Sequence, residues 1–262
     1  MSVDLKDAGV VITGAGRGIG EALARRFAAE GARLVLADVD SSVEAVAESL
    51  GAQAVVGDAA SEAGVDALVT SALEALGAID LYCANAGIAP MGGAEAPEDV
   101  WARTWDVNVM SHVRAARVLL PHWLERGRGH FLATVSAAGL LTSLGSAPYS
   151  VTKHGALAFA EWLLSTYKHR GISVQALCPQ GVNTKMYENT GPSGKLLMGD
   201  SLIEADQVAD LVVQALAGEQ FLILPHPEVA GYYAARATQN DRWIAGMNKL
   251  QRKVEEVTHE PR

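Results

Sequence analysis

The sequence predicts an α/β protein in which a single doubly wound domain forms around a parallel sheet of seven strands. Apolar runs of strand length recur seven times, and amphipathic helical segments separate them. Hydrophobic residues make up 49% and charged residues 19% of the 262 positions, which is typical of a globular α/β protein. The length permits one domain or two. Because no linker, composition shift or internal repeat interrupts the pattern, we predict one domain spanning residues 1–262.

The predicted strands and helices alternate along the chain. The strands lie at residues 9–15, 33–39, 52–57, 79–87, 129–137, 172–179 and 221–226. The helical segments at 18–31, 61–77 and 204–218 carry apolar residues at i, i+3 and i+4, and each ends in glycine. Strict alternation predicts a parallel sheet with helices on both faces.

Two segments depart from this alternation. Residues 185–201 contain Gly191, Pro192, Gly194 and Gly199, so we expect an irregular or mobile loop, and residues 185–203 are predicted to form a substrate lid. The tail from residue 226 to residue 262 has a helical pattern with no strand after it. It is predicted to be a C-terminal helical extension that covers a subunit contact.

Charge and cysteine usage exclude several classes of function. The formal net charge of -9 and the lack of a Lys/Arg cluster argue against nucleic acid as a partner. The chain has no run of about 18 apolar residues and no signal-peptide pattern at its start, so we expect no membrane span and a cytoplasmic location. Cys83 and Cys178 each end an apolar run, which predicts reduced core thiols and no disulfide or metal site.

A glycine-rich run follows the first predicted strand. In 13-TGAGRGIG-20, glycines at a strand-to-helix turn allow close backbone approach to a pyrophosphate, and the helix N-terminus attracts its charge. A tight turn that serves only helix packing is the alternative. Asp38 ends the next strand, 18 residues after Gly20, near the offset at which an acid meets an adenosine ribose. Although Asp38 could be a solvated loop acid and Arg17 could hold a phosphate, we predict NAD over NADP because Asp38 would repel a 2′-phosphate.

Tyr149 and Lys153 lie four residues apart, directly after Pro148, at the start of a predicted helix. That spacing brings both side chains onto one helical face. Moving a phenol pKa from about 10 to 7 needs about 4 kcal/mol, and one cation at about 4 Å supplies this at an effective dielectric constant of about 20. An aromatic packed in the core beside a solvated lysine is the alternative. The pair therefore predicts a proton-transfer site, provided that the site is partly enclosed.

Three motifs together resemble the short-chain dehydrogenase/reductase family over about residues 8–225. They are TGxxxGIG, the NAG at residues 85–87 and the YSVTK at residues 149–153. The resemblance implies a single Rossmann-type domain with a seven-stranded sheet and a catalytic set of Asn108, Ser136, Tyr149 and Lys153. In the family the asparagine helps to position a water beside the lysine. From the residues alone, Ser136 could equally be a strand-end cap, and Asn108 could be a buried amide bonded to backbone.

The resemblance also implies the cofactor-binding residues. Where the family usually has PGxVxT, this chain has 179-PQGVNT-184, so Gln180 replaces a glycine and puts a side chain where the family's backbone approaches the nicotinamide. The predicted cofactor-binding residues are Gly14, Arg17, Gly18, Ile19, Gly20, Asp38, Asp58, Asn85, Ala86, Gly87, Tyr149, Lys153, Pro179, Val182 and Thr184.

The resulting expectation is an NAD-dependent enzyme that interconverts a secondary alcohol and its ketone. A 3-oxoacyl-thioester reductase is one alternative, but an expected preference for NADPH makes Asp38 count against it. A non-catalytic module that senses NAD is the other, and the intact Tyr, Lys, Ser and Asn set disfavours it. Family members commonly form tetramers through the helix before Ser136 and the helix bearing Tyr149. Since residues 155–167 are apolar on more than one face, we expect a homo-oligomer, most simply a tetramer.

The predicted substrate is an apolar small molecule. Lys185 and Lys195 are the only cations of the lid, which argues against acidic or phosphorylated substrates. The apolar residues expected to form the pocket are Met186, Tyr187, Leu196, Leu197 and Met198 of the lid, with Leu140 and Leu141 behind Ser136.

Overall fold

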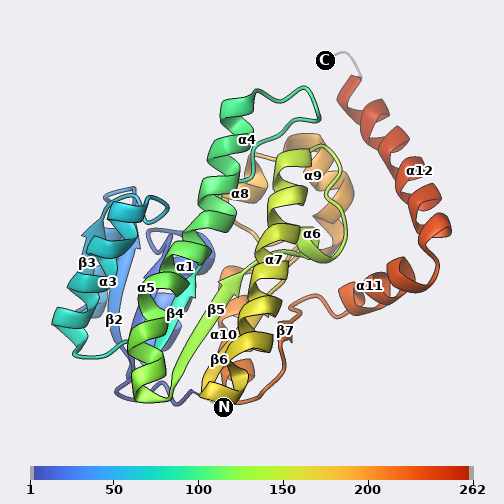
Figure 1. The fold of residues 1–262 in the computed structure, drawn as a ribbon. Helices are drawn as coiled ribbons and strands as arrows, with labels where there is room; N and C mark the ends of the chain where they lie inside the picture. Colours follow the sequence, from blue (N-terminus) through green and yellow to red (C-terminus); the bar gives the residue numbers. More distant parts are fainter. Residues whose placement is uncertain (1–2, 260–262) are drawn as a thin grey trace.

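The computed structural model describes residues 3–259 and contains one sheet of seven parallel strands (Figure 1). The strand order is β3-β2-β1-β4-β5-β6-β7. The predicted α/β fold is confirmed, although the strands end earlier than the apolar runs do, because the residues after each strand turn into loops at the carboxyl edge. The strands are β1 (Gly9–Thr13), β2 (Arg33–Asp38), β3 (Gln53–Val56), β4 (Leu81–Ala84), β5 (Gly129–Thr134), β6 (Ile172–Leu177) and β7 (Leu222–Ile223).

Helices cover both faces of the sheet, because alternate strand residues point to opposite sides. Val11 and Phe131 belong to the core formed with α3 (Glu62–Leu76), α5 (Ser111–Arg126) and α7 (Ala147–Tyr167). Val10 and Ile12 belong to the core formed with α1 (Gly18–Ala29), α2 (Ser42–Leu50) and α10 (Ala205–Leu216). Both cysteines are buried free thiols, as predicted.

The order of the strands reverses between β1 and β4, which are neighbours in the sheet. A crevice forms at such a point, outside the carboxyl ends of the strands, and it is the usual ligand site of doubly wound sheets. The short helix α6 (Ala137–Leu140) follows β5 at this edge, and α4 (Glu98–Trp105) leads into α5 through a π-helical turn at Asp106–Met110. The fold therefore places the predicted motifs around one crevice.

The segment expected to be an irregular loop is helical, so that prediction was wrong. Residues 185–201 form α8 (Lys185–Glu188), α9 (Gly191–Met198) and a 3-10 turn at Gly199–Ser201. Gly191, Pro192 and Gly199 mark the boundaries of α9: Gly191 has a φ of 60°, Pro192 occupies the first turn, where its missing N–H costs nothing, and Gly199 caps the C-terminus. The base of the lid is held by backbone, since Asn183 N–H donates to the Ile203 carbonyl at 2.8 Å.

The C-terminal extension consists of α11 (Glu228–Thr238) and α12 (Asn240–His259), so its predicted helical structure is confirmed. In Figure 1 these two helices form the red end of the chain, beside α7 and α9, and α12 packs against α9. The apolar side of α12 carries Trp243, Met247, Leu250 and Val254, which are at least half-buried. The extension therefore lies beside the lid, a position that the sequence pattern does not indicate.

Within residues 3–259, no helix is long and apolar enough to cross a bilayer. Nor do His, Cys, Asp and Glu side chains gather anywhere in that range into a group that could hold a metal ion.

Candidate active site

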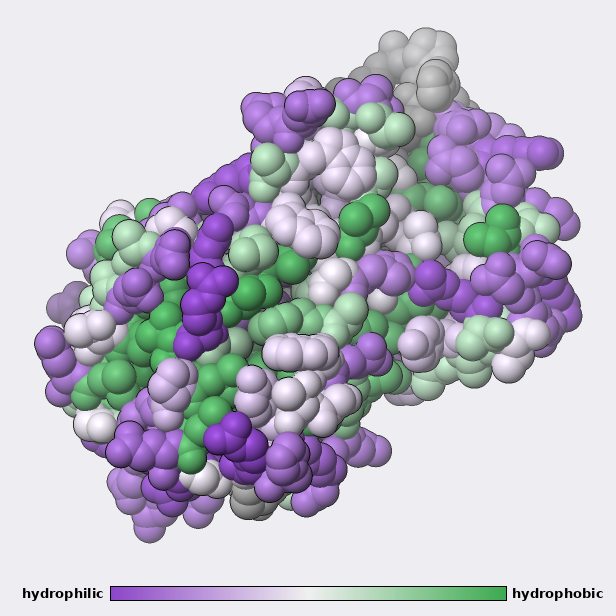
Figure 2. All heavy atoms as spheres, in the orientation of Figure 1, coloured by the Kyte–Doolittle hydropathy of each residue, from purple (hydrophilic) through white to green (hydrophobic). Residues whose placement is uncertain are grey.

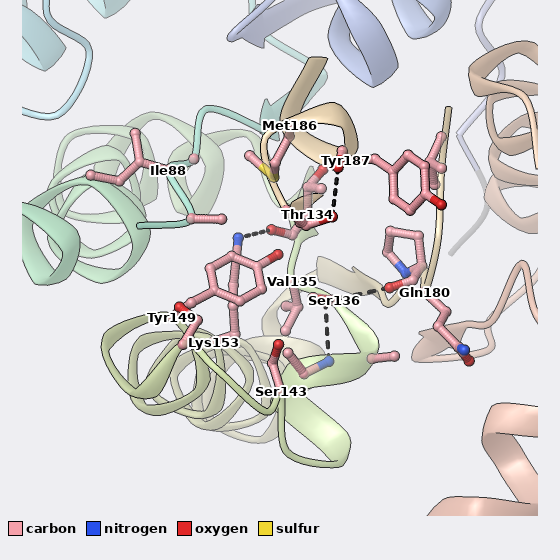
Figure 3. A pocket seen from close by; sticks show the side chains of 18 of the residues that line it. Ile88, Thr134, Val135, Ser136, Ser143, Tyr149, Lys153, Gln180, Met186 and Tyr187 are labelled. Atoms are coloured by element: carbon pink, nitrogen blue, oxygen red, sulfur yellow. Dashed lines mark hydrogen bonds between the residues drawn. The ribbon is translucent and has the colours of Figure 1, made fainter. Parts of the chain in front are cut away.

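A cavity of about 990 Å³ opens at the carboxyl edge of the sheet. It runs from the glycine-rich turn after β1, past α6 and α7, to the lid and the C-terminal extension. All the predicted catalytic and cofactor-binding residues line it except Gly20 and Asn108. A close view shows Tyr149 and Lys153 side by side near the end of β5, with Met186 and Tyr187 on one side of the pocket and Ser143 on the other (Figure 3).

The glycine-rich turn forms one end of the cavity. Gly14 and Gly18 have φ values of 65° and 59°, which favour glycine. A Cβ atom on Gly20 would lie 2.1 Å from the Gly14 carbonyl oxygen, so this position permits only glycine. No side chain caps the N-terminus of α1 at Arg17, which leaves its first N–H groups without such a partner. A positive helix end with uncapped donors has the properties that bind a pyrophosphate.

Asn85 holds this turn in place. Its Nδ2 donates to the carbonyl oxygens of Thr13 (3.0 Å) and Gly14 (3.2 Å), and its Oδ1 accepts from Thr134 Oγ1 at 3.1 Å. Thr13 Oγ1 in turn accepts from the N–H groups of Asn85 and Ala86. The Asn85 side chain thus links the ends of β1, β4 and β5, and it shapes the cavity wall through the backbone. The two threonines were not predicted, because Ser and Thr at strand ends are common without any such role.

Asp38 faces the glycine-rich turn. Its Oδ2 accepts from the Gly16 N–H at 2.9 Å, and its Oδ1 accepts from the Asp40 N–H at 3.1 Å. Arg17, the residue that complicated the cofactor prediction, is exposed and lies 3.5 Å from Asp40. An acid therefore lines the cavity at the predicted place, and the nearest guanidinium already faces a carboxylate.

Asp58 lines the cavity beyond β3. Partial burial raises the pKa of its carboxyl group, but the Ala60 N–H (3.0 Å) and the Arg103 guanidinium (3.1 Å) outweigh that effect and leave the pKa below its usual value. Asp58 is thus held as a carboxylate, able to accept hydrogen bonds.

Lys153 is buried, and it reaches the carboxyl end of β5 from α7. Its Nζ donates to the Thr134 carbonyl oxygen at 2.9 Å and lies 5.6 Å from the ring centroid of Tyr149. Ser136 is also buried; its Oγ caps α6 by accepting from the Ala138 N–H at 3.1 Å. The predicted Tyr, Lys and Ser side chains therefore meet in one enclosed place, and the alternative of a solvated lysine is wrong.

Burial changes the pKa values of both members of the pair. It lowers the pKa of Lys153 from 10.5 to about 8. It raises the pKa of Tyr149, and the hydrogen bond with Ser136 counteracts it only in part. We expected the cation to lower the pKa of the Tyr149 phenol, but the loss of hydration has the larger effect. A protonated phenol, poised to give a proton, is thus the resting state of the site.

Asn108 lies behind the cavity wall, in the π-helical turn. Its Oδ1 accepts from the Ile88 N–H, and its Nδ2 donates to the Ile88 carbonyl and to Thr152 Oγ1, at distances from 2.9 to 3.0 Å. Both amide protons are therefore used, and one acceptor position of Oδ1 is left. A Cβ atom on Gly87 would lie 3.4 Å from both Asn108 Oδ1 and Lys153 Nζ, so these atoms flank the same glycine.

The loop at residues 179–184 forms the wall opposite Tyr149. Its Gln180, which replaces the family's glycine, directs its side chain away from Tyr149 (Figure 3) and donates from Nε2 to Ser201 Oγ at 3.2 Å. The Gln180 N–H donates to Nδ1 of the buried His226 (3.1 Å), whose Nε2 therefore donates to the carbonyls of Gly181 and Ser201. The substitution leaves the loop backbone open to the cavity. The sequence offered no signal for His226, since a histidine at the end of an apolar run has many structural uses.

The other end of the cavity is mainly apolar. Of the residues predicted for it, Leu196 is exposed and Leu140 lies in the core, while the others line the cavity. The C-terminal extension adds a wall that the sequence analysis missed. The apolar and aromatic lining consists of Met91, Leu141, Leu144, Met186, Tyr187, Leu197, Met198, Tyr232, Trp243, Met247 and Leu250.

Comparison with known proteins agrees with this geometry. Residues 8–194 match the family model described as short chain dehydrogenase. The chain is 37% identical to 1-deoxy-11-beta-hydroxypentalenate dehydrogenase of Streptomyces exfoliatus over 235 residues, which cover 86% of this chain and 85% of that protein.

Two solved structures are also similar. A short-chain dehydrogenase/reductase of Burkholderia phymatum in complex with NAD has a TM-score of 0.83 and 30% identity, over 91% of this chain and 96% of that one. A 3-ketoacyl-(acyl-carrier-protein) reductase of Brucella melitensis complexed with NADH has a TM-score of 0.77 and 30% identity, over 85% and 98%.

Proposed function

The chain belongs to the short-chain dehydrogenase/reductase family and is an oxidoreductase of alcohols and ketones that uses a nicotinamide cofactor; we propose that it works with NAD and that Tyr149 is its acid and base. The observation that carries the proposal is the enclosed cluster of Tyr149, Lys153 and Ser136 at the switch point of the sheet. Residues 1–262 are proposed to act as one cofactor-binding domain, in the cytoplasm.

Each residue of the cluster has one task. Ser136 donates a hydrogen bond to the substrate oxygen, and Tyr149 takes the hydroxyl proton in oxidation or returns it in reduction. Lys153 is proposed to hold the ribose of the cofactor and to stabilise the phenolate. When bound, the nicotinamide accepts or supplies the hydride. Asn108 is proposed to keep a water beside Lys153 with the free acceptor position of its Oδ1.

The test is a spectrophotometric screen of cyclic and acyclic secondary alcohols with NAD, run on the protein and on Tyr149→Phe. We expect NADH to form with the unmodified protein. The variant should lose turnover and still bind NADH, since it lacks only the ionisable oxygen. Turnover by the variant would refute the role of Tyr149.

NAD is proposed over NADP on the strength of Asp38. Its carboxylate lines the cavity beside the glycine-rich turn, and the neighbouring Arg17 faces Asp40. A ribose with two free hydroxyls can donate to Asp38, whereas a 2′-phosphate would meet a like charge. A kcat/KM value at least about tenfold higher with NADP would overturn this preference, because tenfold corresponds to about 1.4 kcal/mol in the wrong direction.

A 3-oxoacyl-thioester reductase is the second candidate. The similarity to the Brucella melitensis reductase favours it, and because that protein was crystallised with NADH, Asp38 no longer argues against it. Including acetoacetyl thioesters with NADH in the screen separates the two candidates. The non-catalytic alternative predicts no turnover with any compound of the screen.

The protein is proposed to form a homotetramer. Three large apolar side chains on α4 and α7 are 43 to 53% exposed: Trp105, Val151 and Trp162. Hydrophobic residues reach the surface on the side of the molecule that carries α4, α5 and α7 (Figure 2). A second copy that covers this helical face would remove the apolar area from water. Sedimentation of a monomer at micromolar concentration would contradict the assembly.

A further inference from the structure

The C-terminal extension lines the apolar end of the cavity and is fastened to α7. Arg236 of α11 donates to the Leu140 carbonyl oxygen, and its Nη1 lies 2.9 Å from Nε2 of His154. His154 Nδ1 lies 2.8 Å from the Ser150 carbonyl, which makes Nδ1 the protonated nitrogen and leaves Nε2 free to accept from Arg236. His154 follows Lys153 in α7, so the extension is anchored one residue from the site.

Charged side chains are distributed unevenly along the cavity. Among residues 3–259, Asp38 and Asp58 are the only carboxylates that line it, and both lie at the end near the glycine-rich turn. The cations Arg17 and Arg103 face acids there. Lys185 follows Thr184, whose Cγ2 would lie 3.2 Å from a Cβ atom on Gly18, so Lys185 begins the lid next to the glycine-rich turn.

Arg242 is the cation at the opposite end. It lies on α12 at the cavity lining, beside Trp243, and its Nη1 donates to Oε1 of Gln239, another lining residue. No acid among residues 3–259 forms an ion pair with Arg242. The side chain is exposed, so it stands at the hydrated rim of an apolar pocket.

We propose that Arg242 binds a carboxylate of the substrate, which is then an apolar alcohol or ketone carrying an acidic group. An apolar body would fill the pocket lined by Met186, Leu197, Met198 and Met247, while its carboxylate stays at the rim, where it keeps part of its hydration and gains a charge-assisted hydrogen bond. This inference rests on the proposed function, because it assumes that the apolar end of the cavity receives the substrate. The sequence analysis argued against acidic substrates because Lys185 and Lys195 are the only cations of the lid, and the inference reverses that expectation. Nothing in the sequence places residue 242 near the lid.

A binding measurement tests the inference without requiring turnover. Adamantane-1-carboxylate and adamantane-1-carboxamide have nearly the same shape and differ in charge. Both are titrated calorimetrically into the full-length protein in the presence of NADH. The variants are Arg242→Gln, Arg242→Lys and the matched control Arg252→Gln, which removes an exposed cation from α12 that does not line the cavity.

The carboxylate is expected to bind the unmodified protein at least about tenfold more tightly than the carboxamide, the ratio given by one hydrogen bond to a charged group. Arg242→Gln should bring the two affinities to within about twofold of each other. Arg242→Lys should retain part of the preference, and Arg252→Gln all of it. Equal affinities for the two compounds in the unmodified protein, no binding of either, or an equal loss in both glutamine variants would overturn the inference.

Kinetics then distinguish the inference from the proposed function. With trans-4-hydroxycyclohexane-1-carboxylate and its methyl ester as alcohols, Arg242→Gln is expected to raise KM for the acid and so to remove the preference for the acid over the ester. If the ester is oxidised and the preference is absent in the unmodified protein, the proposed function stands and the carboxylate inference fails. If the carboxylate probe binds through Arg242 and no secondary alcohol is oxidised, the proposed function fails.

Discussion

Replacing Lys153 by methionine tests the electrostatic basis of the proposed mechanism. The ammonium group lies 5.6 Å from the centre of the Tyr149 ring; Lys153 is buried and Tyr149 is half-buried. At an effective dielectric constant of about 20, a unit charge at that distance stabilises a phenolate by about 3 kcal/mol. If the phenolate is needed for oxidation, the loss of the charge lowers kcat at pH 7 by roughly a hundredfold.

The assay is NADH formation at saturating NAD between pH 6 and about pH 10, a range that covers the titration of Lys153. Since Lys153 itself loses its proton above about pH 8, the unmodified protein loses the charge as well, and the difference between the two proteins should narrow at high pH. Lys249→Met, which removes an exposed lysine of α12, is the control. An equal loss of kcat at every pH would refute the reasoning, because a purely structural role of Lys153 has no such dependence.

Three further predictions follow from the same structure. Lys153→Met should unfold at a higher temperature than the unmodified protein at pH 7. Burial of the ammonium lowers its pKa from 10.5 to about 8, which lowers the free energy of unfolding by about 3 kcal/mol at pH 7. The variant recovers this free energy but loses the hydrogen bond to Thr134, which is worth about 1 kcal/mol. Between pH 8 and 10.5 the unfolded chain binds more protons than the folded protein, so the unmodified protein should gain stability as pH rises through this window. A melting temperature of Lys153→Met at or below that of the unmodified protein at pH 7 would contradict the prediction. Asp38→Ala should lower kcat/KM for NAD by at least about tenfold and leave the value for NADP unchanged or higher, and an equal loss for both cofactors would count against a ribose contact. Gly20→Ala should weaken NADH binding and lower the melting temperature, because its Cβ would lie 2.1 Å from the Gly14 carbonyl oxygen; normal binding measured by fluorescence titration would show that the turn is not needed.

Much of the fold could be predicted because it depends on local patterns. Apolar runs of strand length and helices that end in glycine are written in consecutive residues, and alternation of strand and helix leaves few topologies. The turn at residues 13–20 and the pair Tyr149 and Lys153 were found for the same reason: their chemistry requires fixed spacings along the chain.

The unpredicted parts of the site depend on contacts between distant segments. His226 reaches the loop after β6, and Arg242 reaches the cavity, only because the chain folds back after β7. The glycines and proline of residues 185–201 suggested a loop, but the segment forms two short helices, and Gly191, Pro192 and Gly199 mark the ends of α9. The direction of the Tyr149 pKa shift depended on how deeply the pair is buried, and a spacing of four residues does not contain that information.

The buried ammonium of Lys153 and the half-buried phenol of Tyr149 are proposed to serve the reactive end of a dinucleotide in the cavity at the edge of the sheet. A crystal structure of the protein with NAD bound is the most direct measurement. We expect the pyrophosphate at the start of α1, the nicotinamide between Tyr149 and Thr184, and Lys153 Nζ within hydrogen-bonding distance of the ribose hydroxyls. A nicotinamide ring on the far side of the sheet edge, or a Lys153 side chain without contact to the ribose, would contradict the account.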